Sequence, residues 1–360
     1  MAVNLALLFV SAVFFLATSA VFYTTAWLLL TFLFRIRAAV PGRGIRATLF
    51  FALMAPPLVA GVLTVGGTFL RHSHEPDEIH RSLYCSDIAR FLAVPDGKIP
   101  VGAGLMIQGA AWLLLLWGLL SGLRLLFATL SLERELRPFL KLPSPKLAAI
   151  LAHIPEDGTR TSLPFFEAAI PPGRSCLLGI RHVRCILSTE LVIASSEEEL
   201  TAIVLHERSH YHAGDVWRTL LVGFLNCVFF SLRPLFLLSR RWREETELAC
   251  DAATTAATGN PLALASAILR VQKASVHTPP LPAVILGFAE ETACSPGRRI
   301  ERLLAYAEQA ILPPGGPLPV SLRQWAVTAA SILIGFALLL TPQALCTAHC
   351  SLEAVARTLH

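Results

Sequence analysis

Residues 193–210 read IASSEEELTAIVLHERSH, and this stretch decides how the rest of the chain is interpreted. A serine followed three residues later by a glutamate forms a capping box, which marks the start of a helix. Two such pairs fit the stretch, Ser195 with Glu198 and Ser196 with Glu199. The apolar residues that follow recur at helical spacing. We therefore expect a buried helix that begins here and carries the final residues of the stretch.

Two histidines on this expected helix are four residues apart. At that spacing His206 and His210 point to one face, where two imidazoles can bind one zinc ion. Glu207 follows the first histidine, where it can accept a proton from an attacking water. The pattern predicts a zinc peptidase site with Glu207 as general base. On its own, the same pattern also occurs on solvated surface helices.

A third zinc ligand is expected downstream, because catalytic zinc sites use three protein ligands and one open position. Glu247 is the predicted ligand, and Asp251 follows one turn later, where it can accept the N–H of a ligating histidine. Glu244 and Glu245 are rivals, but neither has an acid four residues later. We expect these two glutamates on a solvated helix face.

Other polar residues near the motif have open roles. Asp215 either orients a ligand or caps the next helix. His212 is expected at the surface or beside a ligand, since it does not share the face of His206 and His210. The donor that stabilises the oxyanion is left open between Arg299, Tyr211 and His212.

The composition indicates a membrane protein, with 54% hydrophobic and 15% charged residues. Soluble domains carry about 25% charged residues. The formal net charge of +5 comes without a basic run interleaved with aromatics, so direct binding of nucleic acid is not expected. A membrane-spanning helix needs about 20 apolar residues. Four runs qualify as transmembrane helices: 1–34, 47–70, 101–123 and 325–344.

The basic residues predict the orientation in the bilayer. The linker 35–46 holds four arginines and no acid, so it should be cytoplasmic. We expect a multi-pass protein of a bacterial-type inner membrane, mainly α-helical, with its catalytic domain in the cytoplasm. The predicted regions are 1–128, three transmembrane helices with an outer loop at 71–100; 129–322, a cytoplasmic α+β domain; and 323–360, the fourth helix and a short outer tail.

Two segments near the motif have expected structures. The fourteen residues 219–232 carry no charge, which suits a buried or re-entrant segment that ends at Pro234. Residues 185–194 look strand-like, and such a strand could bind an extended substrate at a sheet edge. A buried strand without substrate contact is the alternative.

The eight cysteines divide between the two sides of the membrane. Cys85, Cys346 and Cys350 fall on the outer side, where disulfides persist, so Cys85 could pair with either of the other two. We expect the remaining cysteines to be reduced: Cys176, Cys185, Cys227, Cys250 and Cys294.

Three motifs together resemble the BlaR/MecR-type membrane metallopeptidases: residues 206–215 (HERSHYHAGD), 232–236 (LRPLF) and 243–251 (REETELACD). Residues 299–304 (RIERLL) resemble a basic segment downstream of the core in the same family. The resemblance covers about residues 187–304 and implies a gluzincin fold that binds Zn²⁺. It implies His206, His210 and Glu247 as ligands and Glu207 as general base.

Family members cleave themselves or a transcriptional repressor, so the resemblance implies a regulatory endopeptidase with a protein substrate. Only about sixteen residues follow the fourth apolar run, so we expect no penicillin-binding sensor domain. The motifs are also similar to HtpX-type and CAAX-type membrane proteases, which leaves membrane-protein quality control as an alternative. A catalytically silent membrane scaffold that keeps the fold is the other alternative.

Overall fold

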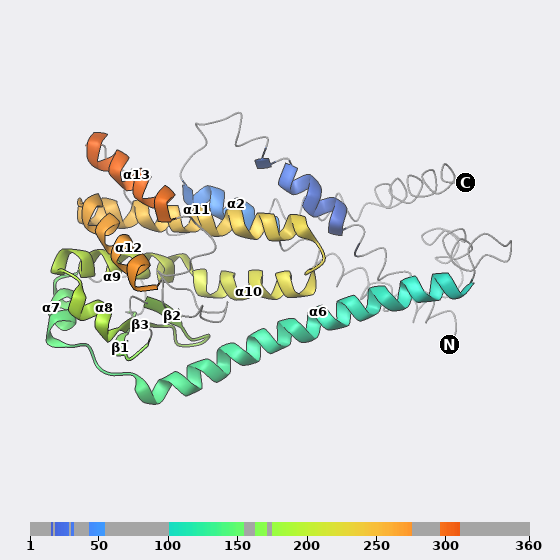
Figure 1. The fold of residues 1–360 in the computed structure, drawn as a ribbon, viewed down its shortest axis with the longest axis horizontal. Helices are drawn as coiled ribbons and strands as arrows, with labels where there is room; N and C mark the ends of the chain where they lie inside the picture. The colour runs from blue at the N-terminus through green and yellow to red at the C-terminus, as the bar shows by residue number, and fades with distance from the viewer. Residues whose placement is uncertain are drawn as a thin grey trace, which may run out of the picture.

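The long helix α6 (Val101–Leu136) runs beneath the other helices and ends at a small sheet (Figure 1). The computed structural model describes residues 16, 19–28, 30–31, 43–54, 101–154, 163–170, 175–275 and 296–309. Within these residues, 109–139 is the one helical segment long and apolar enough to cross a membrane, with a mean hydropathy of 1.9. This finding supports the expectation of a membrane protein and of a mostly helical fold.

The third expected transmembrane helix is longer than the sequence analysis predicted. The apolar run ends at Leu123, but α6 continues to Leu136. No proline or glycine interrupts the charged part, and the helix ends only where Pro138 lies in the short 3₁₀ turn η1 (Arg137–Phe139). The end of the apolar run therefore does not mark the end of α6.

The other expected crossings are described only in part. Residues 19–28 are helical, and α2 (Arg43–Ala52) begins four residues before the expected run 47–70, inside the arginine-containing linker. The run 325–344 lies outside the described residues, as do Cys85, Cys294, Cys346 and Cys350. The four described cysteines are free, as expected.

A three-stranded sheet supports the helix that carries the motif. Its strands are β1 (Phe165–Ala168), β2 (Ser175–Leu178) and β3 (Arg184–Ser188), in the order β1-β3-β2. β3 pairs in parallel with β1 and antiparallel with β2.

The strand expected at 185–194 is shorter than predicted, and it fits the alternative of a buried strand without substrate contact. Only 185–188 is strand, because residues 189–194 form the short helix α8 (Thr189–Ala194). The strand is also central in the described sheet, so its edges are already paired and it cannot bind a substrate strand.

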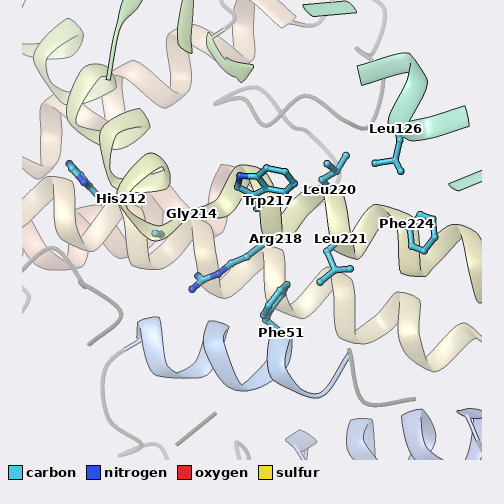
Figure 2. Close-up of a pocket in the computed structure, with 10 residues that line it drawn as sticks. Phe51, Leu126, His212, Gly214, Trp217, Arg218, Leu220, Leu221 and Phe224 are labelled. Carbon is cyan, nitrogen blue, oxygen red and sulfur yellow. The ribbon is translucent and has the colours of Figure 1, made fainter. Parts of the chain in front are cut away.

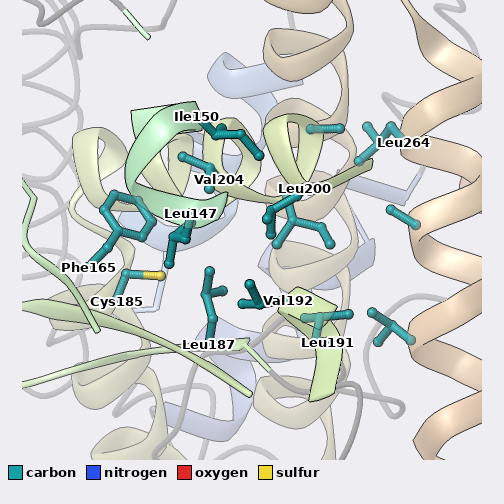
Figure 3. Packing of buried hydrophobic residues seen from close by; sticks show 14 of the residues in the cluster. Leu147, Ile150, Phe165, Cys185, Leu187, Leu191, Val192, Leu200, Val204 and Leu264 are labelled. Atoms are coloured by element: carbon teal, nitrogen blue, oxygen red, sulfur yellow. The ribbon is translucent and has the colours of Figure 1, made fainter. Parts of the chain in front are cut away.

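The main hydrophobic core fills the space between the sheet and the helices above it. Helix α7 (Pro145–His153), α8, α9 (Glu197–Ala213), α12 (Pro261–Ser275) and α13 (Pro296–Gln309) all contribute side chains. Leu147, Leu187 and Leu200 are fully buried at its centre (Figure 3). This core fixes α9, and with it the histidine pair.

Both ends of α9 are fixed by local interactions. Ser196 and Glu199 form the capping box, which decides between the two predicted pairs. Glu199 also binds Arg270 and Ser266 of α12, so the cap ties two helices together. Gly214 ends α9 in the left-handed conformation, with φ of 71°.

The uncharged segment 219–232 is mostly helical, and six of its fourteen residues are buried, whereas Phe230 and Ser231 are exposed. It belongs to α10 (Asp215–Val228), which packs along α6, and the chain then turns into α11 (Arg233–Thr258). Pro234 lies in the first turn of α11, where a missing N–H costs little, so it begins the next helix. Helices α2, α10 and α11 share a second core that includes Trp242.

Candidate metal centre

Two histidines of α9 face each other in the interior. The Nε2 atoms of His206 and His210 are 3.1 Å apart, and both side chains are buried. The two rings meet edge to face, with centroids 4.8 Å apart. The four-residue spacing on a capped, buried helix therefore produces the pair that the sequence predicted.

Each histidine has a carboxylate at its other ring nitrogen. His210 Nδ1 lies 2.9 Å from Asp215 Oδ2, and His206 Nδ1 lies 3.2 Å from Asp251 Oδ1. An acceptor at Nδ1 favours the proton there and leaves the Nε2 lone pair for a metal. Gly214 takes the N-cap position of α10, and no side chain caps this helix. Of its two expected roles, Asp215 is thus placed for orienting a histidine.

Glu247 of α11 completes the group. Its two carboxylate oxygens lie 3.5 Å from His206 Nε2 and 3.5 Å from His210 Nε2. One possible ligand atom from each of the three residues lies within 4.8 Å of the others. Two imidazoles and a carboxylate converging in this way suit a zinc ion.

Arg299 of α13 supports both acids of α11. Its Nε and Nη2 donate to Asp251 at 2.8 and 2.6 Å, and its Nη1 lies 2.9 Å from Glu247 Oε2. Burial alone would raise the pKa of each carboxyl. The charges of Arg299 and the histidines outweigh burial and hold the pKa of Glu247 at about 2. The same balance, with Arg299 and His206, keeps the pKa of Asp251 well below its usual range.

The Cys250 thiol also lies at the centre, although the sequence analysis gave it no role there. Its Sγ is 3.4 Å from His210 Nδ1, and with Asp215 these residues form a second group that could hold a metal. Burial raises the pKa of Cys250 to about 12. This second group contains only one of the two histidines, whereas the group with Glu247 contains both. The group with Glu247 is therefore the better match to a zinc site.

Glu207 lies next to His206 on α9 and is almost fully buried. Its Oε1 accepts a hydrogen bond of 2.7 Å from the hydroxyl of Ser175, which begins strand β2. Ser175 was not predicted, because nothing in the sequence around it indicates that β2 lies against α9. One oxygen of Glu207 is thus anchored by the sheet.

Among the neighbouring residues, Glu244 differs from expectation. Glu244 is buried and pairs with Arg241 and with Arg298 of α13, so it does not lie on a solvated face. Arg299 is bound to two carboxylates, which disfavours it as the oxyanion donor. His212 is half-buried, lines a pocket and is not part of the group of possible ligands, which agrees with the expectation that it is not a ligand.

That pocket lies between α2, α6 and α10 and has a volume of about 600 Å³. Figure 2 shows Phe51, Leu126 and Trp217 around it. Arg218 also lines it, 5.6 Å from the centroid of the Phe51 ring and 3.3 Å from Asp215 Oδ1. Arg218 therefore forms an ion pair with Asp215, as Arg299 does with Asp251.

Residues 168–291 match the model of a family described as BlaR1 peptidase M56. The matched segment contains both histidines, Glu207, Glu247 and Asp251, and it ends before Arg299. The match confirms the resemblance to the BlaR/MecR-type family and indicates a peptidase. No curated protein matches the chain.

Proposed function

We propose that the chain is a zinc-dependent membrane endopeptidase, with His206, His210 and Glu247 as its metal ligands. The observation that carries the proposal is the orientation of the two imidazoles. Each has an aspartate at Nδ1, and both turn Nε2 toward Glu247. This is the arrangement that metal-ligating histidines adopt when carboxylates fix their tautomer. When bound, zinc would supply Lewis-acid activation of water and of the substrate carbonyl.

The chain's own residues then have separate tasks. Glu207 accepts the proton of the attacking water and passes it to the leaving amine. The Ser175 hydroxyl holds one oxygen of Glu207 and leaves the other for proton transfer. Asp251 and Asp215 keep the imidazoles in the ligating tautomer.

Strand β2 is the proposed binding edge for the substrate backbone. It pairs only with β3 in the described sheet, which leaves its other edge without a strand. Ser175 on this strand binds Glu207 directly, so a peptide added along β2 would run beside the base. Extended peptides commonly bind in this way, through main-chain hydrogen bonds.

The membrane helix and the family match support a regulatory role in the membrane. We propose that the domain faces the cytoplasm and cleaves a protein substrate, either a transcriptional repressor or the chain itself. Comparing cleaved peptides from cells with wild-type chain and with Glu207→Gln would identify the substrate. Fragments present only with the wild type are the expected products.

The variant Glu207→Gln tests the proposal in the purified protein. It should keep one zinc per chain, because Glu207 is not a ligand, and lose proteolysis by about 10²–10⁴-fold, the usual contribution of a general base. Zinc content is measured by elemental analysis and proteolysis on a protein substrate. Glu190→Gln, at an exposed position of α8, is the control and should keep full activity.

Two results would contradict the proposal. Undiminished cleavage by Glu207→Gln would remove the base assignment. A wild-type chain that binds no zinc would leave the silent membrane scaffold as the better interpretation.

A further inference from the structure

We infer that Arg299 is a positioning residue that makes α13 part of the metal centre, so that zinc binding and docking of α13 stabilise each other. The inference rests on the proposed function. It adds a residue from outside the segment that matches the family model, which ends at residue 291.

All three nitrogens of the Arg299 guanidinium group contact acids of α11. Two of them donate to both oxygens of Asp251, at 2.8 and 2.6 Å, in the paired geometry that arginine forms with a carboxylate. The third lies 2.9 Å from Glu247 Oε2. Arg299 is itself buried. It therefore contacts a proposed ligand and the acid that orients another ligand, His206, at the same time.

The contacts fix which way Glu247 faces. With Oε2 beside Arg299, Oε1 is left toward His210 at 3.5 Å. Without the guanidinium, Glu247 and Asp251 would lose the donors that fix their carboxylate oxygens. A carboxylate that is free to rotate toward other donors is a weaker ligand or a weaker support for one.

Helix α13 is also held by contacts that do not involve Arg299. The effect of Arg299 on the proposed ligands can therefore be tested without removing all the contacts that dock α13. Leu303, Ile300 and Tyr306 pack against the main core. The adjacent Arg298 lies 3.3 Å from Glu244 on the same helix, α11, but Glu244 is not at the metal group. Arg298 thus ties α13 to α11 without touching a ligand.

Because Arg299 joins α13 to the ligand set, the coupling must act in both directions. A bound zinc ion would fix Glu247, and Glu247 would in turn hold Arg299 and the first turns of α13. Removing zinc should loosen α13, and removing the arginine should weaken zinc binding.

The experiment uses the full chain purified in detergent, with Arg299→Gln, Arg299→Lys and the control Arg298→Gln. Zinc affinity is measured by competition with a chromogenic chelator. Arg299→Gln should weaken it by about 10–100-fold, the usual effect of losing such a supporting partner, while Arg298→Gln stays close to wild type. The zinc affinity of Arg299→Lys should lie between those of the two glutamine variants, because lysine keeps the positive charge but cannot form the paired hydrogen bonds of a guanidinium group.

Hydrogen exchange of residues 296–309 gives a readout that does not depend on activity. Zinc should slow exchange there in wild type and in Arg298→Gln, and it should have no such effect in Arg299→Gln. If Arg299→Gln fails to fold, the inference is tested instead with Arg299→Lys, by its zinc affinity and by the effect of zinc on hydrogen exchange in α13.

Wild-type zinc affinity in Arg299→Gln would overturn the inference, even if that variant were less stable. The inference would also be overturned if the rate of hydrogen exchange in α13 of the wild type were the same with and without zinc. Either result would leave the proposed function intact if Glu207→Gln still binds zinc and fails to cleave. Failure of the wild type to bind zinc would instead remove the proposed function itself.

Discussion

At the scale of single residues, the centre repeats one arrangement twice. His206 meets Asp251, which meets Arg299, and His210 meets Asp215, which meets Arg218. In each case a buried cation stabilises a buried carboxylate, and the carboxylate fixes a histidine. Buried carboxylates are costly without such partners. The histidines of α9 are therefore preorganised by acids and arginines from three other helices, α10, α11 and α13.

The proposed base, Glu207, is held by a hydrogen bond from Ser175 instead of by an ion pair. The effect of removing this hydrogen bond can be tested. Ser175→Ala deletes the hydroxyl that donates to Glu207 Oε1. A hydrogen bond to a charged group contributes about 1.5–3 kcal/mol, so kcat/KM for a protein substrate should fall by about tenfold or more. Zinc content should stay unchanged, since Ser175 touches no proposed ligand.

Ser188→Ala is the matched control for this variant. Ser188 is also a fully buried serine of the sheet, but its hydroxyl has no hydrogen-bond partner in the described part of the chain. Its removal should leave kcat/KM unaltered. Equal losses in both variants would mean that the sheet, and not the bond to Glu207, sets the activity.

At the scale of elements, sequence motifs within one helix predicted the features that depend on residues close together in the chain. The capping box and the His–Glu–His spacing placed α9 and the face that carries both histidines, because one helix contains all of these residues. Glu247 and Asp251 followed from the same spacing on α11. Arg299 and Ser175 could not be assigned their contacts, because these depend on how α13 and β2 pack against other elements.

The strand expected at 185–194 shows how a short apolar run misleads. Leu191 and Val192 are adjacent and both buried, whereas Ile193 is 73% exposed. A strand would place Leu191 and Ile193 on one face. The burial follows a helical turn instead, and six residues are too few for the periodicity to show this from sequence.

The packing of α10 on α6 gives a prediction about these two elements. A side chain at Gly118 would lie 2.7 Å from the carbonyl oxygens of Cys227 and Val228. Gly118→Ala should force the helices apart and cost about 1–3 kcal/mol, as overpacking does. The thermal midpoint of the detergent-solubilised chain should therefore fall.

Gly109→Ala, in the same helix, is the control. A Cβ there meets no atom within 4 Å among the described residues. Alanine is the better helix former by up to about 1 kcal/mol, so this variant should match or exceed wild-type stability. A fall in midpoint as large as that of Gly118→Ala would mean that loss of glycine, and not the close helix contact, destabilises the chain.

At the scale of the whole molecule, hydropathy predicted a membrane helix but not how the domain joins it. The apolar part of α6 is continuous with a charged part, and Leu132 and Leu136 on that part pack against the sheet. Sequence alone shows where the apolar run stops. It does not show that the helix continues as a support for the domain, because that depends on contacts distant in the chain.

The exposed apolar face of α6 leads to the last prediction. Trp117 is 59% exposed within the segment 109–139, whereas Trp242 is 1% exposed and packs against Phe51. An exposed apolar helix of this length is expected to meet lipid over a core of about 30 Å. Lipids brominated in their acyl chains should therefore quench most of the fluorescence of a variant that keeps only Trp117. A variant that keeps only Trp242 should lose little, because the protein shields that ring. If brominated lipids left Trp117 as bright as Trp242, then α6 would not cross the bilayer, and its apolar face would need a protein partner instead.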